Sequence, residues 1–375
     1  MKVCHLSVLR GFAGLGEQLS NEQAAAKVLS GVDWEVKAFF AVSDTSANCV
    51  TRLPWGFRGL LSRKLFAWLW LLKHVHKYDW VLMRYDPSDP FGPVFAPFLK
   101  HRVSVHHAKE VEAMPAIRAG WRGALAGLIE RLCGHRTIRH ADGIIAVTDE
   151  IRRYQLNRVA SYTDLPSSVY PNGVVLDSLP LLDDHRPTNA WVLGFMATQF
   201  QPWHGLDQLL DALSDWLAQQ SGQSNRKQVI LHLMGELLPP EIAAIKQLRT
   251  MAGDQLLIYV HGHTGPVQCR EIFAHCHVGL GSFALERQGL TEASTLKVRE
   301  MLAYGVPVYS GHPDSALPDS FPYYVCEAIN IDSILQFAQA HVTATREAIR
   351  SEAAPLIDKR ACISGVVDFL KSLPR

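Results

Sequence analysis

Cysteine is scarce in this sequence, and no two cysteines have the CxxC spacing of a metal or redox motif. The 375 residues contain seven cysteines, an odd number, scattered along the chain. They are Cys4, Cys49, Cys133, Cys269, Cys276, Cys326 and Cys362. Disulfide-rich secreted domains need dense, paired cysteines, and structural zinc sites need closely spaced ligands. The pattern therefore argues against both and favours a reducing compartment, and we expect no metal site.

A long hydrophobic run is also missing. The longest apolar stretch, Leu65–Leu72, has eight residues, whereas a helix that spans a bilayer needs about 20. The N-terminal segment Met1–Leu9 lacks the apolar core and cleavage site of a secretory signal, and it predicts a first buried strand. We therefore expect a cytoplasmic protein, with peripheral binding to the inner face of the membrane as an alternative.

No charge of one sign dominates, because the formal net charge is only +1. This balance removes the general electrostatic case for a nucleic-acid partner. The charge is unevenly divided, since residues 1–188 have a net charge of +5 and the remainder has −4. The N-terminal half is therefore the half expected to meet an anionic partner, such as a lipid surface or a lipid-linked phosphate.

Short apolar runs alternate with helical patterns along the chain, which predicts βαβ units and parallel sheets. The first series of expected strands is Val3–Leu9, Glu35–Ala41, Trp80–Arg84, Val103–Val105 and Gly143–Val147. The second series is Trp191–Met196, Val229–Met234, Leu256–Val260, Val278–Gly281 and Val306–Tyr309. The expected fold class is α/β, with two Rossmann-like, doubly wound domains. Ligands of such domains bind at the carboxyl ends of the strands, so we expect a site in a cleft where the domains face each other.

A polar, proline-containing segment separates the two series. We assign residues 1–180 to a first domain, 181–188 to a linker and 189–345 to a second domain. Residues 346–375 form a C-terminal helical segment with an apolar face that is suited to packing back on the first domain. That face contains Ile363, Val366, Val367 and Leu370.

The most informative segment is 289–308, which reads as a loop, a helix, a glycine and a strand. Ser294 or Thr295 is a candidate N-cap, and the backbone N–H groups of the following turn form an anion site suited to a diphosphate. Lys297 opposes the helix dipole, which favours an anion as its partner. Glu300 lies about one turn further on, and its carboxylate suits a pair of vicinal hydroxyls. Glu292, in the preceding loop, is placed to reach a second polyol.

This segment resembles the E-x7-E motif of retaining glycosyltransferases of the GT-B class, in particular glycosyltransferase family 4. Glu292 and Glu300 match the two glutamates, and the Ala303-x-Gly305-x-Pro307 continuation also matches. Five further segments resemble the family in the correct order. They are 78–85, 141–150, 170–174, 202–206 and 258–262.

The resemblance implies that residues 1–180 are the acceptor-side domain and residues 189–345 the nucleotide-sugar-binding domain. It also implies a role for each matching residue. Glu292 would contact the transferred sugar, Glu300 would hold the nucleotide ribose, and backbone N–H groups near Thr295 and Leu296 would bind the diphosphate. The family generally needs neither a metal nor another cofactor, because helix dipoles and protein charges replace the cation. It also implies front-face attack, with assistance from the leaving phosphate.

One departure from the family weakens the expected diphosphate clamp. The family commonly has an arginine and a lysine five residues apart after the first strand of the second domain, where this chain has Gln199 and His204. His204 would then serve as a donor or a cation, and Lys297 would carry more of the charge. The alternative is that His204 only packs beside Trp203 in a loop.

Two candidates follow strands of the first domain. His106 and His107 come at the end of an expected strand, and the resemblance implies that a histidine here contacts the donor sugar. We favour His106 as the catalytic candidate, with His107 second. The glycine-bearing loop 11–16 is not a GxGxxG motif, but Gly16 allows the backbone to approach a phosphate or an acceptor.

Basic and aromatic residues cluster in two segments of the first domain, 55–73 and 118–139. An interfacial helix at an anionic membrane surface is one interpretation, since acceptors of such enzymes are often lipid-linked. A buried core helix at Leu65–Leu72 is the favoured interpretation.

The leading hypothesis is a hexosyl transfer in polysaccharide or glycoconjugate biosynthesis. A nucleotide-sugar donor would give its sugar to a glycan or lipid-linked acceptor, with retention of configuration. The alternatives are a nucleotide-sugar epimerase of the same fold and a non-catalytic subunit that binds nucleotide sugars.

Overall fold

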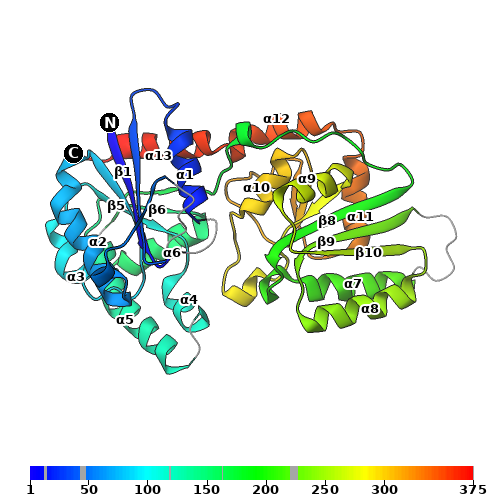
Figure 1. Ribbon diagram of the computed structural model, residues 1–375, viewed down its shortest axis with the longest axis horizontal. Coiled ribbons are helices and arrows are strands. Elements are labelled where there is room, and N and C mark those ends of the chain that lie inside the picture. The colour runs from blue at the N-terminus through cyan, green and yellow to red at the C-terminus, as the bar shows by residue number, and fades with distance from the viewer. Residues whose placement is uncertain (12–14, 43–47, 118–119, 163, 220–226, 375) are drawn as a thin grey trace. The chain divides into compact units, whose positions relative to one another are not determined.

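The computed structural model describes residues 1–11, 15–42, 48–117, 120–162, 164–219 and 227–374. The chain divides into two compact units. The first unit consists of Met1–Pro171 together with Lys359–Arg375, and the second of Asn172–Asp358. Each unit is a parallel sheet covered by helices, which is the α/β architecture that the alternation of patterns predicted (Figure 1).

The first unit contains a seven-stranded sheet in the order β3-β2-β1-β4-β5-β6-β7. Its strands are β1 (Lys2–Leu9), β2 (Asp33–Phe40), β3 (Val50–Arg52), β4 (Trp80–Arg84), β5 (Arg102–His106), β6 (Gly143–Ala146) and β7 (Ser167–Val169). The central strands are buried almost throughout, as expected of parallel strands with helices on both faces.

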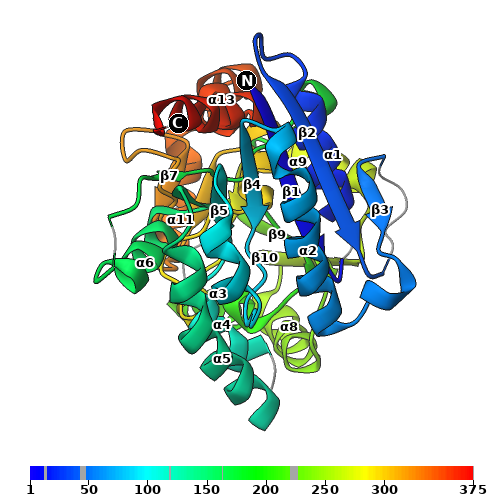
Figure 2. The same ribbon diagram turned by 90° about the vertical axis from the view of Figure 1, so that its left-hand side faces the viewer.

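Two groups of helices cover this sheet (Figures 1 and 2). On one face lie α1 (Leu15–Ala26) and α13 (Lys359–Ser372), which contact each other. The crossovers that run in the opposite direction along the sheet place the other helices on the second face. These are α2 (Leu60–His74), α3 (Gly92–Phe95) with the 3-10 turn η3 (Ala96–Phe98), α4 (Glu110–Ile117), α5 (Trp121–Ile138) and α6 (Asp149–Val159).

The second unit contains a six-stranded sheet in the order β10-β9-β8-β11-β12-β13. Its strands are β8 (Ala190–Gln199), β9 (Gln228–Glu236), β10 (Leu256–Gly262), β11 (Val278–Leu280), β12 (Val308–Ser310) and β13 (Tyr324–Cys326). The chain first proceeds from β8 to β10 and then crosses back to β11, so the strand order reverses between β8 and β11. The crevice outside the carboxyl ends of two such strands is the usual ligand position in an open α/β sheet.

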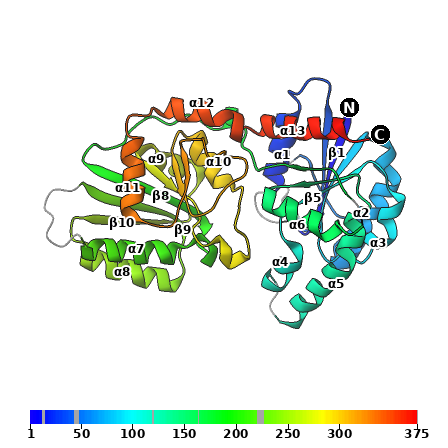
Figure 3. The ribbon, with the colours of Figure 1, turned by 180° about the vertical axis from the view of Figure 1, so that it is seen from behind.

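The helices of the second unit also form two layers (Figures 1 and 3). One layer contains α7 (Leu206–Gln219), α8 (Pro239–Ala252) and α11 (Ile331–Ala340), and its apolar residues form one core cluster with the sheet. The other contains α9 (Pro266–His275), α10 (Leu296–Ala303) and α12 (Arg346–Ile357), around a second core cluster. The predicted motif therefore lies on α10 and the loop before it.

The division between the units differs from the expected linker at 181–188. It falls between Pro171 and Asn172, because Val174 and Leu176 are buried in the core of the second unit. The N–H of Val174 also donates to the carbonyl of Ile357, at 2.9 Å. A polar composition marked an exposed connection at 181–188 but not the point at which the packing changes.

The C-terminal segment 346–375 is two helices that belong to different units. Helix α12 packs in the second unit, whereas α13 packs on the first. The apolar face expected around Ile363 and Leu370 is buried, and Lys359 Nζ lies 3.7 Å from the carboxylate of Glu22 on α1. A helix that begins after Asp358 thus returns to the first unit.

Among the described residues, no helix combines the length and the apolarity needed to cross a bilayer. The longest apolar stretch lies within α2, where Ala67, Trp68 and Leu71 are buried in the core of the first unit. The core-helix interpretation is therefore correct for the inner face of α2, while Leu69 and Leu72 remain exposed.

Candidate functional site

Three loops of the second unit meet at the carboxyl ends of β8, β11 and β12. The N–H of Phe283, after β11, donates to the carbonyl of His204, after β8, at 3.0 Å. The N–H of Gly311, after β12, donates to the carbonyl of Ser282 at 2.9 Å. The loop before α10 joins them, because the N–H of Ala293 donates to the carbonyl of Pro313 at 3.2 Å. These bonds bring the predicted motif to the position where the strand order reverses.

The N-terminus of α10 is organised by its backbone. Thr295 is the N-cap residue, with φ −94° and ψ 139°, and its side chain makes no capping hydrogen bond. Leu296 begins the helix, and its side chain packs against the core. Unbonded N–H groups in a first helical turn are partners for an anion. Thr295 and Leu296 stand at this helix end, and the contact of their backbone N–H groups with a diphosphate stays a prediction.

Lys297 is the most unusual side chain of this site. Its Nζ is buried, lies 5.1 Å from the ring centroid of Phe195 on β8, and has no hydrogen-bond partner among the described residues. Burial lowers its pKa from 10.5 to about 7. A buried ammonium without a partner is costly, which makes it a candidate for binding an anionic ligand.

Two further buried polar atoms beside α10 also lack a protein partner. They are Oγ1 of Thr295 and Nε2 of His312, in the loop after β12. Lys297 is close enough to His312 to contribute to lowering its pKa, although burial is the larger cause. Buried polar groups are nearly always hydrogen-bonded, so three such atoms around one helix end indicate a site whose partner is a ligand or water.

His204 is neutral in the ligand-free protein, which argues against the cationic interpretation. Burial, and then the charge of Lys297, lower its pKa from 6.5 to about 3. Its Nδ1 accepts the N–H of Gln201 at 2.8 Å, which places the proton of the neutral ring on Nε2. The second departure, Gln199, accepts a hydrogen bond from Gln201 Nε2 at 2.8 Å. Neither position supplies the fixed charge that the family has there.

The two predicted glutamates lie at opposite ends of the motif. Glu292 is buried, and its Oε1 accepts the N–H of Ser315 at 2.7 Å, so the loop after β12 orients it. Glu300 is half-buried on α10 and faces α9. Burial is the main cause of the raised pKa values of Cys269 and Tyr304, and the negative charge of Glu300 is the next cause.

Arg299 holds the loop before α10 in place, and the sequence reasoning missed it. This fully buried side chain pairs with Asp314, with one nitrogen to carboxylate oxygen distance of 2.9 Å, and donates to Ser294 Oγ at 3.0 Å. Its Nε donates to the carbonyl of Asn172 at 3.1 Å. The available signal was an arginine on the apolar side of the helix, but its acidic partner is 15 residues away in a loop without periodicity.

Ser294 helps to hold this loop in place, because its hydroxyl is bonded within the protein. Its Oγ accepts hydrogen bonds from Arg299 and from the N–H of Asn172, the latter at 3.0 Å. Its carbonyl accepts from Asn172 Nδ2 at 2.6 Å. Ser294 therefore holds the loop in place, and its predicted place in the donor site stays a prediction.

In the first unit, His106 does not present a free ring nitrogen. Its Nε2 bonds Ser104 Oγ at 2.8 Å and its Nδ1 bonds Glu110 at 2.7 Å. The ring is fully buried and stacks on Tyr85, with centroids 4.7 Å apart. The expectation that His106 faces a ligand is contradicted, because a side chain at the last position of β5 points into the packed layer.

His107 is the stronger of the two histidine candidates. It is half-buried directly after β5. Burial, and then Arg84 and neighbouring histidines, lower its pKa well below 6.5, so its ring is neutral. A neutral imidazole can donate one hydrogen bond and accept another, which suits contact with sugar hydroxyls.

Gly16 lies buried in the first turn of α1. Its carbonyl accepts a hydrogen bond from Cys49 Sγ at 3.8 Å. The remainder of the predicted loop, residues 12–14, lies outside the described residues. Gly16 thus lies at the start of a helix. Its backbone contact with a phosphate or an acceptor stays a prediction.

A metal cluster is not found in the part of the chain that the structure describes. No group of three or more His, Cys, Asp and Glu side chains there is arranged to hold an ion.

Comparison with known proteins gives structural neighbours only. No protein-family model matches the sequence. No curated protein matches it either. A lipopolysaccharide outer core galactosyltransferase in its apo form aligns over 99% of both chains, with 14% identity and a TM-score of 0.61. A UDP-forming trehalose-phosphate synthase from Burkholderia xenovorans, in complex with glucose-6-phosphate, aligns over 99% of this chain and 100% of its own, with 11% identity and a TM-score of 0.58. An α-glucosyltransferase in complex with UDP-glucose and DNA aligns over 99% and 100%, with 15% identity and a TM-score of 0.57.

These alignments run through both units and both sheets. The chain has the GT-B fold. At 11–15% identity the likeness establishes the fold alone. Within the GT-B fold of this chain, α10 and the loops after β8, β11 and β12 are where the predicted motif residues lie.

Proposed function

We propose that this protein is a retaining glycosyltransferase that takes a sugar from a nucleotide-sugar donor bound at the N-terminus of α10. The observation that supports this most is the buried, unpartnered Nζ of Lys297 beside Thr295 and His312. A cation without a partner at a positive helix end calls for an anion with more than one charge. A nucleoside diphosphate has that charge, and it carries a ribose and a sugar for the two glutamates.

In this proposal the diphosphate lies against the backbone N–H groups of Thr295 and Leu296. Lys297 takes up a proton when the anion arrives, because a nearby negative charge favours the ammonium form. His204 contributes one neutral hydrogen bond from Nε2. The half-buried carboxylate of Glu300 accepts the ribose hydroxyls, and Glu292, held by Ser315, accepts hydroxyls of the sugar.

The reaction exchanges one bond at the anomeric carbon for another. The bond from this carbon to the phosphate oxygen breaks, and an acceptor hydroxyl oxygen forms the new glycosidic bond on the same face. The acceptor proton passes to the leaving phosphate, so that a nucleoside diphosphate is released. The site binds the departing charge with the α10 backbone and protonated Lys297, which is the electrostatic stabilisation that such a transition state requires.

The structural neighbours support a nucleotide-sugar donor and a phosphorylated sugar as ligands of this fold. One neighbour is described in complex with UDP-glucose and another with glucose-6-phosphate. We propose a glycan or lipid-linked acceptor and a role in polysaccharide or glycoconjugate biosynthesis. His107 is proposed to contact the sugar in place of His106.

A thermal-shift screen against UDP-, GDP-, ADP- and dTDP-sugars tests donor binding, because a ligand that binds only the folded state raises the melting temperature. We expect one nucleotide to give a clear shift that Lys297→Met and Glu300→Gln abolish. Lys246→Met is the matched control, since it removes an exposed lysine of α8. If none of the four donor classes raises the melting temperature, the proposal fails.

Product analysis then separates the reaction classes. We expect sugar transfer only when an acceptor is present. The variants Glu292→Gln and His107→Ala should each reduce the rate of transfer by about 100-fold or more, while both still bind the donor. Conversion of the donor without any acceptor would instead identify an epimerase. Donor binding without turnover in an acceptor screen would identify a non-catalytic binding subunit.

A further inference from the structure

Helix α2 of the first unit departs from the usual burial pattern, although Ala67, Trp68 and Leu71 of its inner side are buried in the core. It buries two cations and exposes leucines: Arg63 is 9% and Lys64 is 2% exposed, whereas Leu61, Leu69 and Leu72 are 44–52% exposed. An amphipathic helix of a protein surrounded by water normally directs its charges outward. The outer side of α2 is therefore chemically unlike a solvent-facing helix surface.

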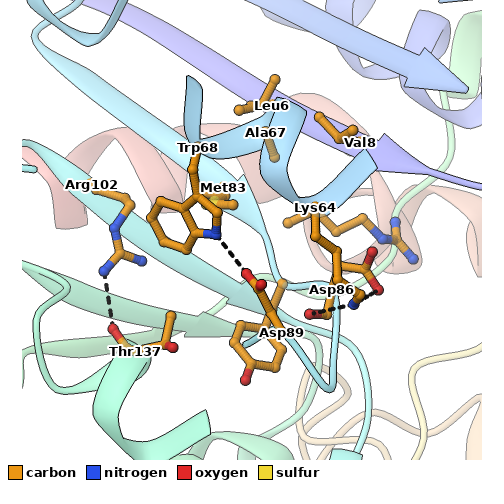
Figure 4. A pocket seen from close by; sticks show the side chains of 12 residues that line it. Leu6, Val8, Lys64, Ala67, Trp68, Met83, Asp86, Asp89, Arg102 and Thr137 are labelled. Carbon is orange, nitrogen blue, oxygen red and sulfur yellow. Dashed lines mark hydrogen bonds and ion pairs between the residues drawn. The ribbon is translucent and has the colours of Figure 1, made fainter. Parts of the chain in front are cut away.

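Specific contacts prevent α2 from turning its leucines inward (Figure 4). Lys64 Nζ lies 2.8 Å and Arg63 Nε 3.2 Å from the carboxylate of Asp86. Trp68 Nε1 donates to Asp89 Oδ2 at 2.6 Å. These buried groups come from the loop after β4 and fix the rotation of α2 about its axis. The outward leucines are thus a built feature of the fold.

Helix α5 likewise buries a charged side chain and exposes apolar side chains on its outer side. Its only carboxylate, Glu130, is fully buried and pairs with Arg158 at 2.6 Å. Its outer side carries an apolar row at positions i, i+4, i+7 and i+11. The row is Trp121, Leu125, Leu128 and Leu132, and each of these side chains is exposed.

The two helices lie on the same face of the sheet, with α3 and η3 between them (Figure 2). Phe95 of α3 stacks near Trp68 of α2, with ring centroids 6.4 Å apart, and α3 contacts α5. Val94 and Phe98, at 60% and 77% exposure, continue the apolar surface. We call the outer side of η1 (Trp55–Phe57), α2, α3, η3 and α5 the docking face.

The docking face holds more than half of the exposed large apolar side chains in the described part of the chain. It has eleven of twenty: Trp55, Leu60, Leu61, Leu69, Leu72, Val94, Phe98, Trp121, Leu125, Leu128 and Leu132. Single exposed apolar residues are ordinary, but a contiguous group of them marks an interaction surface.

The charges of this face indicate which partner covers it. Helix α2 contains no Asp or Glu, and the single Glu of α5 is buried, so the exposed charges of both helices are positive. Exposed cations include Lys73, Arg122, Arg131 and Arg136. Four arginines, Arg10, Arg58, Arg63 and Arg122, also line an open hollow at the N-terminal ends of α2 and α5, with no carboxylate in its lining.

We propose that the docking face binds the interfacial region of a bilayer that contains anionic lipid. The leucines and tryptophans enter the boundary between headgroups and acyl chains, and the arginines and lysines bind headgroup phosphates. A second copy of this chain suits the face poorly, because two surfaces with only positive exposed charge repel each other. This inference does not depend on the proposed sugar transfer.

Vesicle flotation of the full chain tests the proposal. We expect binding to vesicles of phosphatidylcholine mixed with phosphatidylglycerol, weak binding to phosphatidylcholine alone, and loss of binding as salt increases. The variant Leu125→Ser/Leu128→Ser should weaken the binding of the protein to vesicles about tenfold or more. The variant Arg131→Glu should do the same, but only with vesicles that contain anionic lipid. All three residues are exposed, so the folded state should be kept, which circular dichroism checks.

Matched controls lie on the second unit. Met251→Ser/Val267→Ser removes exposed apolar residues and Lys246→Glu reverses an exposed charge, and both should bind like the wild type. Equal binding by the Leu125→Ser/Leu128→Ser variant and the wild type would overturn the proposal. The proposal would also be overturned if the wild type did not bind vesicles but sedimented as a dimer, and if this variant were a monomer. That result would assign the face to a second copy of the chain.

Discussion

At the residue scale, the burial of Lys297 lowers the stability of the ligand-free protein. The same burial leaves a cation at the end of α10. Its pKa is about 7 in the folded protein and about 10.4 in an unfolded chain. Between these values the unfolded state binds the additional proton, so this residue makes stability rise with pH from about 7 to about 10.4. Below pH 7 its full cost is present.

Lys297→Met should therefore stabilise the ligand-free protein at pH 6, while it removes donor binding. Methionine removes the buried charge and puts an apolar thioether in place of the ammonium beside the ring of Phe195. For a unit of the size of Asn172–Asp358, each kcal/mol gained corresponds to roughly 2–4 °C in melting temperature. Calorimetry at pH 6 and pH 9 measures the effect, which should shrink at the higher pH. A lower melting temperature at both values would refute this account of Lys297.

Donor affinity should depend on the same proton. Above pH 7 the free site holds neutral Lys297, and binding must then take up a proton, so the dissociation constant should rise by up to about tenfold per pH unit. Isothermal titration in two buffers of different ionisation enthalpy measures the proton uptake directly. His204 should not contribute, since its pKa of about 3 keeps it neutral throughout this range.

At the scale of elements, one buried ion pair determines the path of the loop that presents Glu292. Arg299 on α10 connects the loop after β12, through Asp314, with Ser294 and Asn172. Side chains nearer to the ligand then follow the backbone that this pair positions.

Asp314→Ala should destabilise the second unit by about 3–5 kcal/mol, because it leaves the guanidinium of Arg299 buried without its carboxylate. The double variant Arg299→Met/Asp314→Leu should recover much of this stability and yet bind the donor weakly, since Ser294 and Asn172 lose their shared partner. Denaturant titration and donor titration together separate the two effects. Equal stability of the single and double variants would show that the unpaired charge is not the cause.

At the scale of the whole molecule, the first unit is built from two segments that are far apart in the sequence. Helix α13 covers α1 and β7 with an apolar face, so the first unit cannot complete its core until α13 has been made. The sheet of the first unit thus depends on contacts that are distant in sequence.

Leu370→Ala should reduce the stability of the first unit by about 2–5 kcal/mol, as expected for a large-to-small change at a side chain that is 1% exposed. Hydrogen exchange should show the loss of protection in β1 and α1. Lys371→Ala, at an exposed position of the same helix, is the matched control. Loss of protection confined to Asn172–Asp358 would contradict the assignment of α13.

Most of the fold was predictable from local patterns. The apolar runs for β1, β4, β5, β6, β8, β9 and β10 are dense and bounded by turn residues, so both sheets were expected with nearly correct strand limits. The strands β3, β7 and β13 were missed, because each has three residues that are not fully buried at or near a sheet edge. The strand β12 begins at Val308, since Pro307 has no N–H for a sheet ladder.

The sequence by itself determined the α/β architecture, the position of the helix that starts near Thr295, and the spacing of Glu292, Lys297 and Glu300, because periodicity, capping and chain order are local properties. Only the tertiary structure decided that His106 is buried between Ser104 and Glu110, that Arg299 pairs with Asp314, and that Lys297 lacks a partner. Burial and partnership depend on which distant segments come together, and those contacts set the cost of each charge.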